Sequence, residues 1–201
     1  TRDAANRDEF FAMTADVLGP VVAGAVAEVI SGAEEAELSF NGAVGELDPA
    51  AAPFVVVDLG GGSTEVVLGD AAGVAASFSA DIGCVRLTER CLHSDPPTVA
   101  EVAAARDVVR ERLGEALRAV PVDGAKTWVG VAGTFTTIAA LAAHLTTYDP
   151  DAIHLSRVSF ADLLGVCGQL IGMSRKQRAA LGPMHEGRVD VIGGGAIVVE
   201  E

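Results

Sequence analysis

Three consecutive glycines between two apolar segments constrain the fold of this chain more than any other feature. The apolar residues 54–57 lead through Asp58 into the glycines at 60–62, and a second apolar segment follows at residues 64–68. Consecutive glycines let the backbone reverse within a few residues and leave room for a bound group beside the main chain. The pattern predicts two antiparallel strands joined by a tight turn, which residues 74–79 extend to a three-stranded meander.

Apolar residues at helical spacing indicate most of the remaining elements. Strands are also predicted at residues 27–30 and, as a buried strand, at 127–131. Aromatic residues make up only 4% of the chain while Ala, Val and Gly abound, which predicts a core of closely packed small aliphatic side chains and favours an α/β fold. The longest predicted helix, residues 98–119, has one apolar face formed by positions 99, 102, 103, 108, 109, 113, 116 and 117. The predicted helices are residues 4–18, 33–40, 98–119, 135–145, 160–171, 175–181 and 188–199.

Charge and cysteine spacing exclude several functional classes. With 28 acidic and 14 basic residues the net charge is −14, which argues against nucleic-acid or anionic-membrane partners. No apolar run reaches the roughly 18–20 residues that span a bilayer. Cys84, Cys91 and Cys167 lack metal-type spacing, which predicts reduced thiols in a cytoplasmic protein. A phosphate substrate fits this charge, because main-chain N–H groups and a divalent cation can hold it.

The first glycine turn has residues suited to phosphate chemistry. The main-chain N–H groups of glycines 60–62 can turn toward a bound anion. A carboxylate beside a phosphate is repulsive unless a cation lies between them, so Asp58 and Glu65 together predict a Mg²⁺ site, with Mn²⁺ as the alternative. The other interpretation is a structural hairpin turn capped by an Asp and a Ser, since a single glycine motif is a weak signal.

Two further segments have candidate site residues. Residues 130–134, Gly-Val-Ala-Gly-Thr, follow a strand and open a helix whose N-terminus can bind an anion, or they form an ordinary strand-to-helix loop. Glu34 and Glu35 lie at the start of another predicted helix, where the helix dipole favours acids whatever their function. Of these two acids, Glu34 fits the structural role better.

In order and spacing, these motifs resemble the exopolyphosphatase and guanosine pentaphosphate phosphatase (Ppx/GppA) family. The motifs are VISGAEEA at residues 29–36, VDLGGGSTE at 57–65 and IGCVRL at 82–87. The resemblance continues through residues 130–134 and 188–192, so it covers nearly the whole chain.

The resemblance implies an actin-like ATPase (ribonuclease H-like) fold with two lobes and an active site in the cleft between them. Each lobe supplies one phosphate-binding loop. Residues 1–38 would be the C-terminal remnant of the first lobe, and residues 39–201 the second lobe. The first-lobe loop, a strand followed by Asp-x-Gly-Ser/Thr-Asn-Ser, does not occur in these 201 residues. We therefore expect the chain by itself to be inactive.

The resemblance also implies residue roles. Glu35 would orient and deprotonate the attacking water, Arg2 would neutralise the transferred phosphate, and Asp58 and Glu65 would hold the metal ion. The implied phosphate-binding residues are Gly60, Gly61, Gly62, Ser63, Thr64, Gly133 and Thr134.

The function implied is release of terminal phosphate from inorganic polyphosphate by Mg²⁺-assisted attack of water. Guanosine pentaphosphate is the alternative substrate. An actin-fold kinase would use the same glycine loops on ATP, but residues 82–87 resemble the phosphatase branch. The non-catalytic alternative is a phosphate-binding, nucleotide-binding or assembly module, for which an exposed apolar helical face predicts a homodimer.

Overall fold

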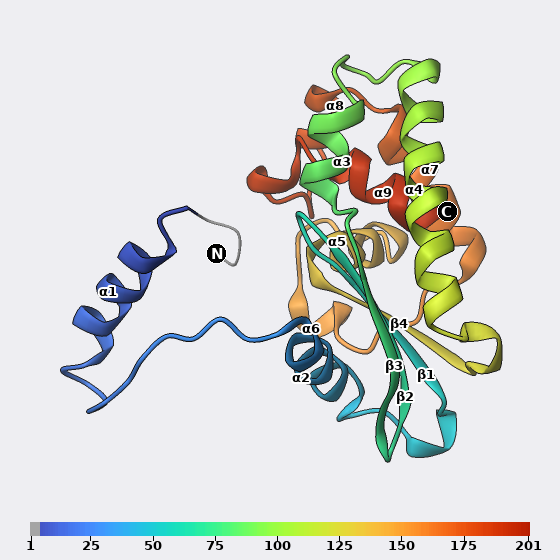
Figure 1. The fold of residues 1–201 in the computed structure, drawn as a ribbon. Helices are drawn as coiled ribbons and strands as arrows, with labels where there is room; N and C mark the ends of the chain where they lie inside the picture. The colour runs from blue at the N-terminus through green and yellow to red at the C-terminus, as the bar shows by residue number, and fades with distance from the viewer. Residues whose placement is uncertain (1–4) are drawn as a thin grey trace. The chain divides into compact units, whose positions relative to one another are not determined.

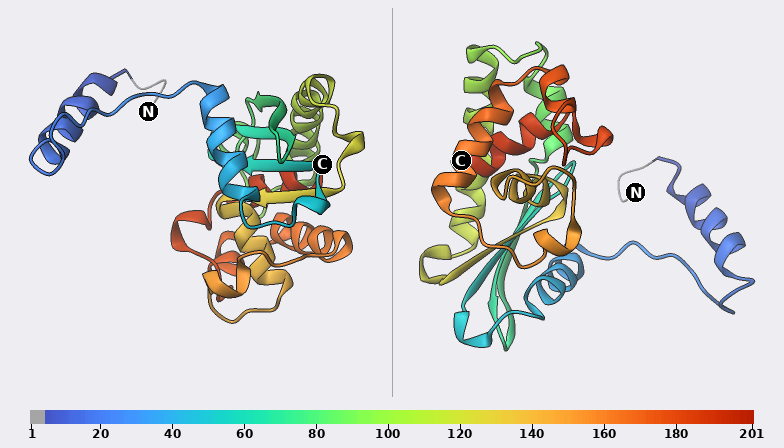
Figure 2. Two further views of the ribbon diagram at one scale, coloured as in Figure 1. Left: turned by 90° about the horizontal axis from the view of Figure 1, so that it is seen from below. Right: turned by 180° about the vertical axis from the view of Figure 1, so that it is seen from behind.

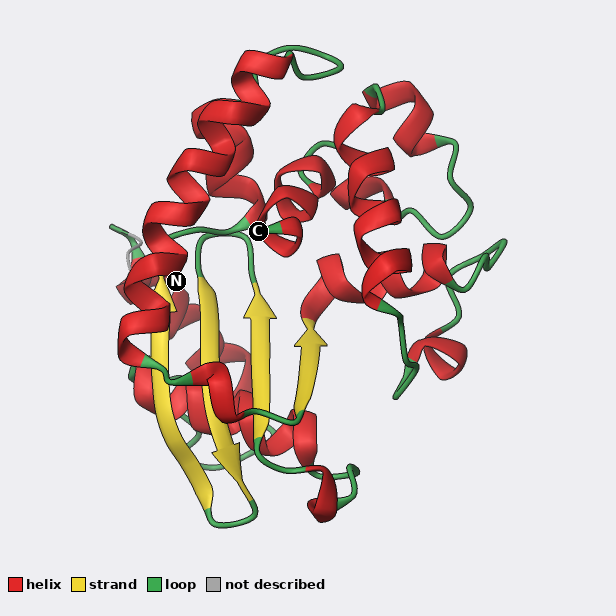
Figure 3. Cartoon of the chain, turned by 90° about the vertical axis from the view of Figure 1, so that its right-hand side faces the viewer, coloured by secondary structure: helices red, strands yellow, loops and turns green. Residues whose placement is uncertain are grey.

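A four-stranded sheet organises most of the chain, whose residues 5–201 are described by a computed structural model. The strands are β1 (Phe54–Leu59), β2 (Thr64–Asp70), β3 (Gly73–Ala80) and β4 (Thr127–Val131). Their order is β3-β2-β1-β4 (Figure 3), with β1, β2 and β3 antiparallel and β4 parallel to β1. The predicted meander and the strand at 127–131 are confirmed.

Helices cover both faces of the sheet and gather at the carboxyl end of β1 (Figure 1). Helix α2 lies on one face and α4 on the other, while α3, α5, α7 and α9 lie beyond the strand ends. Their bounds are α2 (Gly32–Val44), α3 (Cys84–Cys91), α4 (Val99–Ala119), α5 (Ala132–Ala142), α6 (Pro150–Ile153), α7 (Phe160–Gly172), α8 (Arg175–Ala179) and α9 (Ile192–Glu200), with 3-10 turns at Pro49–Ala51, Val122–Gly124 and Glu186–Arg188.

Side chains alternate between the two faces of β1, as strand geometry requires. Phe54 and Val56 pack against Phe40 of α2 on one face. Val55 packs against Ala116 of α4 on the other. Asp58 lies two residues after Val56 and leaves the same face of β1, so its carboxylate points to the α2 side of the sheet.

The largest core cluster lies among the helices at the carboxyl end of the sheet. It joins Leu59 of β1 to Leu87 of α3, Ile138 of α5, Leu170 of α7 and Ile197 of α9, all at most 2% exposed. The buried members of this cluster are aliphatic apart from Cys167, as the 4% aromatic content predicts. Tight packing of these helices fixes the ends of β1 and β4, where the candidate site lies.

The chain divides into two units, residues 1–35 and 36–201, and all four strands described belong to the second (Figure 2). The first unit contains helix α1 (Arg7–Leu18), which buries none of its residues, and an irregular segment. The prediction of a strand at residues 27–30 is wrong, because no described strand pairs with this segment.

Several element boundaries also differ from prediction. Helix α5 begins at Ala132 and α9 at Ile192, and helices α3 and α6 were not predicted. The predicted face of α4 is partly wrong, because Val99 is 89% exposed while Ala105 is buried. Strand β4 lies at the edge of the sheet, so Trp128 is 58% exposed rather than buried.

Among the residues that the structure describes, no helix has both the length and the apolar character that crossing a membrane requires.

Candidate active site

The two glycine turns begin at neighbouring positions of the sheet. Strands β1 and β4 are parallel, and Asp58 lies opposite Val131 in their ladder. The chain therefore leaves both strands at the same end of the sheet. It enters residues 60–63 after β1 and helix α5 after β4. Ligands of α/β sheets commonly bind at the carboxyl ends of the strands.

Main-chain hydrogen bonds from the N-terminus of helix α3 hold the first turn in place. The N–H of Cys84 donates to the Gly60 carbonyl, and the N–H groups of Val85 and Arg86 donate to the Gly61 carbonyl, each at 3.0 Å. A Cβ at position 83 would overlap the Gly61 carbonyl, so only glycine permits this approach. The first N–H groups of α3 are thus occupied by the turn and do not face an anion.

Main-chain N–H groups of the first turn remain available to a ligand. The Gly60 N–H donates to the Ser63 carbonyl at 3.0 Å. Gly61 and Gly62 are exposed, and within residues 5–201 no hydrogen bond occupies their N–H groups. An anionic ligand can use these two N–H groups, and the N–H and hydroxyl of Ser63 likewise have no hydrogen-bond partner among residues 5–201.

The predicted metal ligands are brought together. Asp58 and Glu65 are direct partners across β1 and β2, so their side chains leave the same face of the sheet. The Ser39 hydroxyl donates to Asp58 Oδ2 and the Ser79 hydroxyl to Glu65 Oε1, both at 2.8 Å. Glu65 is only 7% exposed, and no basic side chain among the described residues pairs with either carboxylate.

Two facing carboxylates without a cation are unfavourable, because like charges directly opposite repel and a buried charge requires a partner. Each serine occupies one oxygen and leaves the other available. Two carboxylates with the remaining positions left to water and phosphate form a donor set that suits Mg²⁺. Among residues 5–201, no group of three or more His, Cys, Asp or Glu side chains is placed to hold a metal ion.

The second turn is packed closely against other residues. Ala132, the first residue of α5, has φ 69°, a left-handed conformation that is uncommon for alanine. Arg188 lies against Gly133, where a Cβ would overlap the guanidinium. Thr134 is buried, and its hydroxyl interacts with the Cys84 side chain. The second turn is therefore in contact with α3, which also holds the first turn.

Two of the predicted phosphate-binding hydroxyls have structural partners. Thr64 is fully buried and donates to the Ile82 carbonyl at 2.6 Å. Thr134 is in contact with Cys84 as described. Burial raises the pKa of the Cys84 thiol, while the Thr134 hydroxyl and the Arg188 charge act in the opposite direction. A raised pKa keeps the thiol protonated at neutral pH, so Cys84 is a poor nucleophile.

The two acids at the start of α2 differ in their contacts. The Ser31 N–H and hydroxyl both donate to Glu34 Oε2 at 2.8 Å. The Glu34 N–H in turn donates to the Ser31 hydroxyl oxygen at 3.2 Å. This capping box confirms the structural role of Glu34, and these hydrogen bonds hold its pKa below the ordinary value. Glu35 lies in the same first turn. The predicted phosphate contact Arg2 lies outside the described residues.

Two arginines beside the turns were not among the predicted site residues. Arg188 donates to the Thr137 hydroxyl at 3.2 Å and lies 5.8 Å from the ring centroid of Tyr148. Arg86 follows the first turn, with its Nη2 3.6 Å from the place of a Cβ at Gly62. Both belong to segments that the family resemblance includes, but only packing shows that their guanidinium groups reach the turns.

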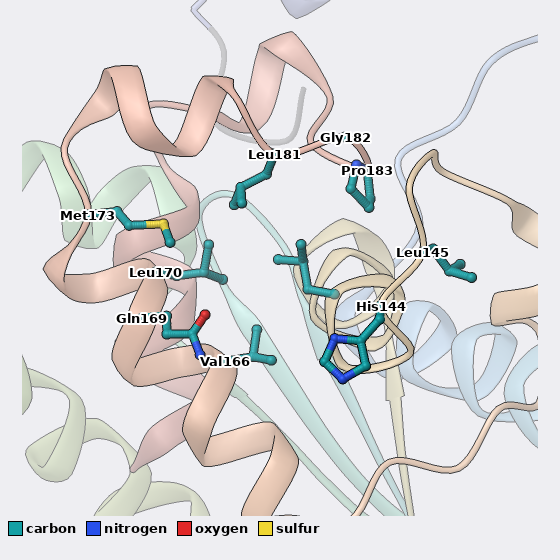
Figure 4. A pocket seen from close by; sticks show the side chains of 10 residues that line it. His144, Leu145, Val166, Gln169, Leu170, Met173, Leu181, Gly182 and Pro183 are labelled. Carbon is teal, nitrogen blue, oxygen red and sulfur yellow. The ribbon is translucent and has the colours of Figure 1, made fainter.

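A cavity of about 320 Å³ lies elsewhere, between the end of α5, helix α7 and the segment after α8 (Figure 4). Its walls are mainly apolar, with Leu170, Leu181 and Met173 among them, and His144 and Gln169 are its polar side chains. None of the predicted site residues lines it, so this cavity is separate from the glycine turns.

Fold and site together define a class of protein: an α/β domain with two glycine turns at the carboxyl edge of its sheet and a facing pair of carboxylates beside one of them. The chain belongs to the Ppx/GppA phosphatase family, whose model matches residues 1–201. The resemblance stated from the sequence motifs is confirmed.

Three comparisons show how close this relationship is. The chain is 74% identical over 200 residues to exopolyphosphatase 2 of Mycobacterium tuberculosis (strain ATCC 25618 / H37Rv), covering 100% of this chain and 62% of the relative. It is 34% identical over 133 residues to the guanosine-5'-triphosphate,3'-diphosphate pyrophosphatase of Photobacterium profundum, covering 66% of this chain and 26% of that protein. The chain therefore spans less than two thirds of the length of these relatives.

The crystal structure of the Aquifex aeolicus Ppx/GppA family member superposes with a TM-score of 0.83 at 30% identity, covering 99% of this chain and 62% of that one. The predicted actin-like ATPase fold is thereby confirmed.

Proposed function

We propose that the full-length protein releases terminal phosphate from inorganic polyphosphate by attack of water on the phosphoanhydride bond. The observation that carries this proposal is the 74% identity, over the whole of this chain, to a protein named exopolyphosphatase 2. Such a reaction needs donors that bind the phosphate and a cation that neutralises its charge. The exposed N–H groups of Gly61 and Gly62 can supply the first, and the two facing carboxylates can hold the second.

The residues take the following roles in this proposal. Glu35 accepts the proton of the attacking water. Ser39 orients Asp58 through its hydroxyl. Asp58 and Glu65 would hold Mg²⁺ or Mn²⁺, which neutralises charge on the phosphoryl oxygens when bound. Arg2 is proposed to neutralise the transferred phosphate.

The remaining loop residues bind the substrate chiefly through the main chain. Gly61 and Gly62 offer their N–H groups, whereas Thr64 and Thr134 shape their turns from buried positions. We further propose that residues 1–38 belong to the first lobe and residues 39–201 to the second. The cysteines described are all free, which supports a cytoplasmic setting.

Phosphate release by the full-length protein from polyphosphate of defined length, with Mg²⁺ present, tests the proposal. We expect one phosphate per cleavage event and products shortened from the end. Products of random internal length, or no phosphate release from any condensed phosphate, would contradict it.

Guanosine pentaphosphate is the second candidate substrate, favoured by the 34% identity to the Photobacterium profundum relative. Competition between the two substrates in one assay decides which has the higher kcat/KM. Light scattering on the 201-residue chain tests the homodimer predicted from its exposed apolar helical face.

A further inference from the structure

Arg86 packs on the first glycine turn with both its main chain and its side chain. Its N–H donates to the Gly61 carbonyl at 3.0 Å. Its Nη2 lies 3.6 Å from the position that a Cβ at Gly62 would take, so the guanidinium borders the exposed side of the turn. The available N–H groups of Gly61 and Gly62 and one guanidinium are therefore adjacent.

The charge of Arg86 has only a weak partner. Arg86 Nη1 lies 3.8 Å from Asp81 Oδ1, with the two side chains 51% and 78% exposed. No hydrogen bond involves the Arg86 side chain within the described part of the chain. Exposed pairs at this distance stabilise a protein very little, so a stronger anion can replace Asp81 at small cost.

We propose that Arg86 is a substrate-binding residue, which contacts the phosphoryl oxygens of a condensed phosphate held at Gly61 and Gly62. Guanidinium groups bind phosphate through two parallel N–H donors, a geometry that a lysine ammonium does not provide. In a chain with a net charge of −14, a cation at the turn also offsets the repulsion of a polyanion. The inference rests on the proposed function and adds a residue to its substrate site.

Arg86 contributes to binding rather than to chemistry in this proposal. Contacts that are equally strong in the bound substrate and in the transition state change KM and leave kcat unaltered. We therefore expect Arg86→Gln to raise KM for polyphosphate, with kcat changed by less than about twofold.

Calorimetric binding of tripolyphosphate to the full-length protein, together with steady-state hydrolysis of polyphosphate, tests the proposal. Arg86→Gln should weaken tripolyphosphate binding by about 10-fold to 100-fold, the range for losing a charge-assisted hydrogen bond. Arg86→Lys should fall between this variant and wild type. Asp81→Asn should tighten binding when Arg86 is present and have less effect in the Arg86→Gln background.

Arg90→Gln is the matched control, because Arg90 is an exposed arginine one turn further along the same helix. It should change binding by no more than about twofold. Equal weakening by Arg86→Gln and Arg90→Gln would show a general charge effect and overturn the proposal, as would a wild-type protein that does not bind tripolyphosphate. Wild-type binding without phosphate release, lost in Arg86→Gln, would support the role of Arg86 while refuting the proposed hydrolase activity.

Discussion

At the scale of single residues, neighbouring acids of the same type have different surroundings. Glu34 completes a capping box with Ser31, whereas the adjacent Glu35 is absent from that box. Asp58 and Glu65 come from different strands and face each other. The role of an acid in this protein therefore depends on its contacts, and substitutions at neighbouring positions should separate structure from chemistry.

The first prediction compares the two acids of α2 in the full-length protein. Glu35→Gln should lower kcat by about 10² to 10⁴, the usual range for loss of a general base, with little change in KM. Glu34→Gln should leave kcat near wild type and lower the midpoint of thermal unfolding. If Glu35→Gln keeps kcat within about threefold of wild type, Glu35 is not the base.

The second prediction concerns the metal. Activity should vanish with chelator and return with Mg²⁺ or Mn²⁺, but poorly with Ca²⁺, whose looser coordination suits octahedral positioning less well. Asp58→Asn should raise the Mg²⁺ concentration for half-maximal activity and lower the rate. Asp70→Asn, at the exposed end of β2, is the control. An unchanged Mg²⁺ midpoint in Asp58→Asn, with lower thermal stability, would assign Asp58 to the turn alone.

At the scale of elements, capping interactions decide where helices begin. Helix α4 starts after Thr98, and Glu101 accepts hydrogen bonds from the main-chain N–H groups of His93, Ser94 and Thr98. The Thr98 hydroxyl also donates to it at 2.9 Å. These contacts, the Thr98 N–H foremost, lower the pKa of Glu101 to about 2. One carboxylate therefore fixes both the start of α4 and the loop before it.

The third prediction follows from the sign of this shift. A carboxyl whose pKa is lower in the folded state than in the unfolded state stabilises the fold above the unfolded pKa, and this stabilisation is lost as pH falls through the folded pKa. Glu101→Gln resembles the protonated acid, so its unfolding midpoint should lie below wild type at pH 7. The difference should shrink between pH 4.5 and pH 2. Glu111→Gln, on the same helix, is the control, and the difference between its unfolding midpoint and that of wild type should not shrink over this pH range.

Sequence reasoning found the elements whose signal is local and missed those that depend on packing. The meander was predictable because apolar alternation and glycine turns specify it within one short stretch of chain. Helix α3 was missed because its first donors bond to the carbonyls of Gly60 and Gly61, which only tertiary structure brings near. The segment at 27–30 was assigned as a strand because it contains Val29 and Ile30, although a strand also needs a partner.

The candidate site also combines features that the local sequence predicts with features that only packing creates. Asp58 and Glu65 were predictable as a pair because both flank one turn. The proximity of Arg86 to Gly62 and of Arg188 to Gly133 comes from segments that pack across the sheet edge, and no spacing in the sequence encodes it.

At the scale of the whole molecule, the core belongs to the second unit. Every buried apolar side chain among the described residues is at or after Ala36, and α1 buries none. The fourth prediction is that residues 31–201, which retain the Ser31 cap, unfold cooperatively with a midpoint within about 3 °C of the 201-residue chain, since no described core is removed. Calorimetry on both chains measures this. Non-cooperative unfolding of the shorter chain would contradict it.

Trp128 on the edge strand β4 gives this molecule an internal optical probe. It is the single tryptophan of the chain and lies four residues before Ala132, where the second turn bends into α5. Because Trp128 is more than half exposed in the folded state, soluble quenchers reach it without unfolding. A change in its emission on adding phosphate or Mg²⁺ to the folded protein would therefore come from the sheet edge itself, in real time and without any label.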